Sequence, residues 1–95
     1  MAAYGIRVEL LGYPTADQYQ SLHTVMANFG FYRTVAGLDP QGNWRHYNLP
    51  HGMYYGESNF DVVTLRDQIT NSVKIGVQPN VLIFVVQATT WAMGW

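Results

Sequence analysis

Two segments of the chain repeat apolar residues at the spacing of an α-helix, and strand-like segments flank both of them. The two apolar stripes are Leu22, Val25, Met26 and Phe29, and Val62, Leu65, Ile69 and Val73. The order strand, helix, strand, strand, helix, strand is typical of a ferredoxin-like βαββαβ sandwich, an α+β fold. We therefore expect a four-stranded antiparallel sheet with both helices on one face.

Turn and cap residues set the expected bounds of these elements. Thr15 is placed to cap the first helix with Gln18 as its capping-box partner, and Gly30 is placed to end it. The expected strands are residues 4–11, 31–36, 44–55 and 81–87. Because proline has no N–H to donate, the pair Leu49-Pro50 predicts a bulge or bend in the third strand.

Composition limits the possible classes of protein. The 95 residues suit one domain, residues 1–95, in which residues 89–95 form a C-terminal tail. The chain has no cysteine, which excludes disulfides, thiolate catalysis and Cys-type zinc sites. The N-terminus does not resemble a signal peptide, and the longest apolar run, residues 81–86, is far too short to span a membrane. We expect a cytoplasmic protein, bacterial or from a phage, with no cofactor and no membrane partner.

The last expected strand, residues 81–87, has apolar side chains on both of its faces. In the expected fold this strand lies at an edge of the sheet, so Leu82, Phe84 and Val86 would face water in a monomer. Only 12% of the residues are charged, and self-association is the simplest way to cover such a surface. We expect a homodimer with these three residues in its interface. The alternative is that residues 89–95 fold over them.

The stretch WRHYNLPHGMYYG, residues 44–56, holds two of the three histidines. His46 and His51 have the chemistry of a general acid and base in a metal-free ribonuclease, with Arg45 or Arg33 to stabilise the phosphorane charge. The catalytic candidates are His46 and Arg45. The alternative is that both histidines are solvated side chains beside a bend. A metal site is not expected, since a third ligand is missing.

Three arginines fall one each on the first three expected strands and would form a basic cluster if they share the open face of the sheet. Aromatic side chains near them would add stacking, as open sheets do for single-stranded RNA. The candidates for nucleic-acid binding are Arg7, Arg33, Arg45, Trp44 and His46. The alternative is ordinary cross-strand pairing with Glu9. The net charge of -1 gives no electrostatic footprint for tight nucleic-acid binding.

The run GYPTADQYQSLHTVMANFGFYRT, residues 12–34, resembles a family of small bacterial proteins that includes the GhoS-type endoribonuclease antitoxins of type V toxin–antitoxin systems. The resembling features are Tyr13-Pro14, Leu22-His23, Met26, Gly30-Phe31, Arg33-Thr34, Leu49-Pro50 and Tyr54. The resemblance implies a ferredoxin-like fold, similar to that of the small CRISPR-associated nucleases, and single-stranded RNA as substrate. It also implies that Arg33 is a candidate for a position that matches the pattern of that family. The CRISPR-associated group typically has an aspartate where this chain has Leu10-Leu11-Gly12.

We therefore expect a GhoS-like protein that binds or cleaves single-stranded RNA without a metal, with an unknown toxin partner. The main alternative is a non-enzymatic, homodimeric protein-interaction module. A third possibility is a small-ligand pocket walled by tyrosines.

Overall fold

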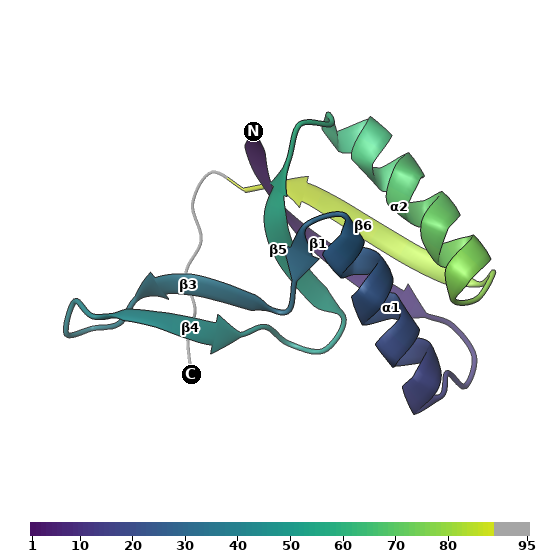
Figure 1. Ribbon diagram of the computed structural model, residues 1–95, viewed down its shortest axis with the longest axis horizontal. Helices are drawn as coiled ribbons and strands as arrows, with labels where there is room; N and C mark the ends of the chain where they lie inside the picture. Colours follow the sequence, from purple (N-terminus) through teal and green to yellow (C-terminus); the bar gives the residue numbers. More distant parts are fainter. Residues whose placement is uncertain (89–95) are drawn as a thin grey trace.

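The computed structural model describes residues 1–88, which form two helices and six strands (Figure 1). Their order is β1 (Ala2–Leu10), α1 (Ala16–Asn28), β2 (Phe31–Tyr32), β3 (Thr34–Leu38), β4 (Trp44–Asn48), β5 (Met53–Ser58), α2 (Val62–Gly76) and β6 (Val81–Gln87). The expected α+β class, with two helices and antiparallel sheets, is confirmed. The expected tail, residues 89–95, lies outside the described residues.

The ends of the helices follow from short polar side chains and a glycine. Thr15 Oγ1 accepts the Gln18 N–H at 3.2 Å while Gln18 Oε1 accepts the Thr15 N–H at 2.8 Å, so the expected capping box is present. Gly30 follows the C-cap with φ 86°, a conformation that favours glycine. Asp61 caps α2 by accepting the Thr64 N–H at 2.7 Å.

The strands form two sheets rather than one. Four strands pair in the order β2-β5-β1-β6, all antiparallel, and β3 pairs with β4 in a separate β3–β4 hairpin that projects from the rest of the molecule (Figure 1). The expected single strands 31–36 and 44–55 are therefore wrong. The first breaks at Arg33, and the second breaks over residues 49–52, near the bend predicted at Leu49-Pro50.

Both helices pack on one face of the four-stranded sheet, where alternate residues of β1 and β5 meet the apolar stripes of α1 and α2. The core consists of Tyr4, Ile6, Val8, Leu10, Leu22, Met26, Phe31, Tyr54, Leu65, Ile69 and Val73. Gly56 on β5 allows the backbone of Gly30 to approach closely, since an added Cβ would collide with the Gly30 carbonyl oxygen. The opposite face, which we call the open face, carries Arg7 and Phe84 directly opposite each other on β1 and β6.

Candidate functional site

A short contact joins a histidine of α1 to a buried tyrosine of β5. His23 Nδ1 lies 2.6 Å from Tyr54 Oη, and the Tyr54 side chain is almost fully buried. Tyr54 points into the core because it is paired with the inward-facing Ile6 of β1. Burial raises the pKa of Tyr54 to about 12, so its hydroxyl stays protonated at neutral pH. The hydrogen bond satisfies the phenol and fixes the orientation of the imidazole.

A second histidine lies near the first. His51 is in the turn before β5, and its ring packs edge-on against Tyr19 of α1 with the ring centroids 4.5 Å apart. Tyr19 is four residues before His23, so the two side chains project from the same side of the helix. This turn contains Gly52 at φ 80°, and its carbonyl accepts the Val8 N–H at 2.8 Å. The turn is thereby fixed to β1.

An arginine completes this group of side chains. Arg33 lies between β2 and β3 and is exposed. Partial burial lowers the pKa of His23, and the positive charges of Arg33 and His51 lower it further. His23 is therefore neutral at pH 7. We call Tyr19, His23, Arg33, His51 and Tyr54 the histidine cluster.

The histidine cluster has the groups needed for proton transfer beside an anion. The contact is compatible with two tautomers of His23. With hydrogen on Nδ1, the imidazole donates to Tyr54 Oη and Nε2 is left as a base, whereas with hydrogen on Nε2, Nδ1 accepts from the Tyr54 hydroxyl. The His51 imidazole, when protonated, is a proton donor, and the Arg33 guanidinium is a permanent cation that suits phosphate oxygens. The arrangement therefore fits acid–base chemistry on a phosphodiester.

Arg45, a predicted catalytic residue, is occupied by a carboxylate of the β3–β4 hairpin. Its Nε lies 2.6 Å from Asp39 Oδ2, and the Asp39 side chain is only 4% exposed. Asp39 also accepts the backbone N–H groups of Gln41 and Asn43. The Asn43 N–H and the Arg45 guanidinium lower the pKa of Asp39. Arg45 therefore stabilises the hairpin turn.

The other predicted residues of the hairpin lie on one exposed side of it. Trp44 and His46 alternate with Arg45 along β4, so their side chains point to the opposite side of the hairpin from Arg45. Trp44 is 74% exposed, and its cross-strand neighbour Leu38 is also exposed. His46 and Arg45 are thus not a converging pair.

The structure separates the five predicted nucleic-acid-binding residues into three groups. Arg7 lies on the open face of the four-stranded sheet, Arg33 belongs to the histidine cluster, and the three residues of β4 belong to the hairpin. The three predicted interface residues stay together, because Leu82, Phe84 and Val86 all lie exposed on the open face of β6.

Sequence reasoning missed most of the histidine cluster. His23 and Tyr54 are 31 positions apart, and although both are among the features that resemble the GhoS type, sequence reasoning assigned neither of them a role. His51 was paired with His46 because of their proximity in the sequence, whereas its ring contact is with Tyr19. Only strand pairing and helix packing bring these side chains together, so no local pattern could have revealed them.

Within residues 1–88, no three histidine or carboxylate side chains lie close enough together to hold a metal ion. No helix in the same residues is both long and apolar enough to cross a membrane. Comparison of the sequence with known protein families and with curated proteins finds no match.

Proposed function

We propose that the protein is a small cytoplasmic protein, similar to the GhoS type, that binds single-stranded RNA and cleaves it without a metal. The fold supports this proposal through its strand order. Four antiparallel strands in the order β2-β5-β1-β6, with both helices on one face, follow the ferredoxin-like arrangement. The β3–β4 hairpin is then an extension between the second and third strands of that arrangement. It leaves the order of the other elements unchanged.

The observation that carries the proposed chemistry is the His23–Tyr54 hydrogen bond within the histidine cluster. It holds a neutral imidazole in place beside a second imidazole and a cation, which is the minimum set for metal-free cleavage of RNA. We place the reaction here rather than at Arg45 and His46, since Asp39 occupies the Arg45 guanidinium. Arg33 is also the position that the resemblance to the GhoS type implies.

In the proposed reaction, His23 has its hydrogen on Nδ1, and its Nε2 removes the proton of a ribose 2′-hydroxyl. The resulting oxygen attacks the adjacent phosphorus. The bond from phosphorus to the 5′ oxygen breaks, and His51 gives its proton to that leaving oxygen. Arg33 stabilises the negative charge of the phosphorane. The products are a 2′,3′-cyclic phosphate and a 5′-hydroxyl, and proton exchange with water restores both histidines.

The β3–β4 hairpin provides a surface for the bases next to the cleaved bond. Its two strands leave the body of the protein at Arg33 and near His51, so its base adjoins the histidine cluster. Trp44 and His46 project from one side of it and are exposed. Aromatic rings stack on every base, which gives binding with little sequence preference.

The direct test is cleavage of an end-labelled, mixed-sequence single-stranded RNA by the purified protein in EDTA. We expect cyclic-phosphate products, no reaction with the all-2′-deoxy analogue, and loss of cleavage in His23→Ala, His51→Ala and Arg33→Ala. Lys74→Ala is the matched control, because it removes an exposed cation from the last turn of α2, which is not part of the histidine cluster. Cleavage that needs a divalent metal, or that persists in both histidine variants, contradicts the proposal.

A second candidate is a non-enzymatic, homodimeric interaction module. The observation that favours it is the exposure of Leu82, Phe84 and Val86, at 58%, 66% and 48%. Neighbouring apolar side chains this exposed are typical of an interaction surface. If the protein neither binds nor cleaves RNA but dissociates from a dimer when Phe84 is replaced by lysine, this function replaces the first.

A further inference from the structure

The backbone of β6 uses only half of its hydrogen-bonding groups within the described part of the chain. At one end of β6 the Leu11 N–H donates to the Asn80 carbonyl, and at the other the Ala88 N–H donates to the Ala3 carbonyl. Successive residues of an antiparallel strand alternate in direction, so the even-numbered residues of β6 bond to β1. The N–H and C=O groups that point away from the sheet are those of Val81, Ile83, Val85 and Gln87.

This outer edge of β6 lacks the features that usually prevent strands from pairing. The segment VLIFVVQ contains no charge, no proline and no glycine. Its pairing with β1 runs without a bulge from Val81 to Gln87. In residues 1–88, no other strand pairs with this edge. Within residues 1–88 the edge is therefore free of bulges, apolar and unpaired.

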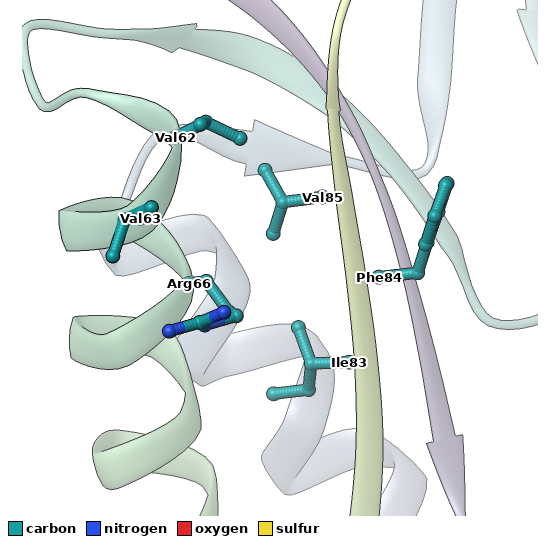
Figure 2. Close-up of a pocket in the computed structure, with 6 residues that line it drawn as sticks. All are labelled: Val62, Val63, Arg66, Ile83, Phe84 and Val85. Carbon is teal, nitrogen blue, oxygen red and sulfur yellow. The ribbon is translucent and has the colours of Figure 1, made fainter.

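Apolar side chains flank the same edge on both sides (Figure 2). Ile83 and Val85 point toward α2, and with residues of that helix, including Arg66, they line a hollow of about 280 Å³. Val62 and Val63, at the mouth of this hollow, are 38% and 53% exposed. Phe84 points the opposite way, onto the open face. A strand added here would cover apolar surface above and below the sheet.

We propose that a second copy of the chain pairs with β6 through its own β6, antiparallel, about a twofold axis at Phe84. Val85 of each copy then pairs with Ile83 of the other, and these are residues whose backbone groups point outward. Phe84 meets its own counterpart in a non-hydrogen-bonded pair, the position where opposed side chains lie closest. The two four-stranded sheets become one continuous sheet, and the hollows beside α2 adjoin across the axis.

The sequence of β6 favours a second copy over an unrelated strand. When the strand is reversed about Phe84, Leu82 faces Val86 and Ile83 faces Val85, so apolar residues meet apolar residues in both directions. A twofold interface requires β6 to be complementary to itself, whereas pairing with an unrelated peptide places no such requirement on β6. β6 itself brings no like charges together, because it has none. Arg66, the one charged residue that lines the hollow, is paired with Asp67 at 2.9 Å. The histidine cluster takes no part, so this inference stands or fails separately from RNA cleavage.

The test combines sedimentation velocity over a range of concentrations with amide hydrogen exchange followed by NMR. We expect a dimer in which the amides of Ile83 and Val85 are protected and lose that protection on dilution. The amides of Phe84 and Val86, which bond to β1, stay protected at every concentration. Face-to-face packing of two open faces would give a dimer in which Ile83 and Val85 exchange freely, and that result overturns the proposal.

Val85→Pro tests the backbone contact directly. Proline is tolerated where an edge-strand N–H faces outward, so this change leaves the ladder with β1 intact. It removes one donor from each copy, and we expect the dimer dissociation constant to rise about 30-fold. Val85→Thr, which keeps the N–H and nearly the same volume, is the matched control and leaves it within about threefold.

Three other results would also contradict the proposal. A protein that is monomeric at all concentrations, with Ile83 and Val85 exchanging freely, has no partner on this edge. A monomer in which these amides are protected at every concentration has part of its own chain there. Unchanged dimerisation in Val85→Pro, with the fold retained by circular dichroism, likewise excludes β6–β6 pairing.

Discussion

Tyr54 shows how one buried polar atom determines its surroundings. A phenol hydroxyl in an apolar core needs a hydrogen-bond partner, because an unsatisfied one costs about 1–3 kcal/mol. Here the partner is His23 Nδ1 at 2.6 Å. The imidazole is therefore held by a bond that the folded protein needs for stability as well as for any chemistry.

The lowered pKa of His23 predicts how stability depends on pH. Between that lowered value and the ordinary value of 6.5, the unfolded chain binds more protons than the folded protein. This contribution to the free energy of unfolding is therefore complete above pH 6.5 and declines as the pH falls toward the lowered pKa. Urea unfolding at about pH 7.5 and about pH 5 should show a larger decline for the wild type than for His23→Gln. An equal decline in both proteins would contradict it.

Two glycines on neighbouring strands predict opposite responses to the same substitution. A Cβ on Gly56 would collide with the Gly30 carbonyl, which is backbone and cannot move aside cheaply. Gly56→Ala should therefore lower the free energy of unfolding by about 3 kcal/mol. A Cβ on Gly5 would lie 3.6 Å from Val86 Cγ1, an ordinary contact. Gly5→Ala should stay within about 0.5 kcal/mol in the same denaturant titration.

Helices were easier to predict than strands in this chain. Capping chemistry is local, so Thr15 and Gln18 are sufficient to place the start of α1. The composition of residues 31–36 and 44–55 favours strands throughout, and β structure does form along most of both segments. The change from one sheet to the other at Arg33 is set by twist and long-range pairing. Neither sheet twist nor long-range strand pairing can be predicted from the composition of a segment.

The β3–β4 hairpin is predicted to be removable. The Leu49 N–H donates to the Arg33 carbonyl at 2.7 Å, which is the bond that closes a β-turn when two residues lie between. Replacing residues 34–48 by Asn-Gly should leave the helical circular dichroism unchanged. The free energy of unfolding should fall by no more than about 3 kcal/mol, since Val35 is the one apolar side chain among residues 34–48 that is buried.

Loss of the helical signal in that shortened protein would show that the hairpin is needed for folding. If the shortened protein keeps its fold but loses RNA binding, the result supports stacking of RNA bases on Trp44 and His46. Asp39 and Arg45 disappear with the same segment, so single substitutions of Trp44 and His46 are the control.

The charge of the protein limits how it can hold RNA. It has five lysines and arginines and a net charge of -1. Two of the arginines already contact carboxylates, Arg45 with Asp39 and Arg66 with Asp67. Few cations remain to displace counterions from a phosphate chain. In the proposed RNA binding, stacking on aromatic rings must therefore supply more of the affinity than it does in strongly basic RNA-binding proteins.

This balance predicts a shallow salt dependence for RNA binding. One or two phosphate contacts give a slope of about -0.7 to -1.4 in a plot of log K against log salt concentration for single strands. Arg33→Ala should reduce the slope by about 0.7, and Trp44→Ala should lower the affinity without changing the slope. Fluorescence anisotropy with a labelled RNA measures both. A slope steeper than about -3 would require basic contacts beyond those of the histidine cluster.

The β3–β4 hairpin has the geometry of a lever. It joins the body where the Arg33 carbonyl accepts the Leu49 N–H, and that hydrogen bond ties its two strands together at the base. Arg33 is one partner of this bond, and His51 follows two residues after the other partner, Leu49. A force on the far end, at Trp44, reaches the body through the chain on either side of this bond. A strand of RNA bound at the tip, as proposed, would therefore pull on the segments that carry Arg33 and His51.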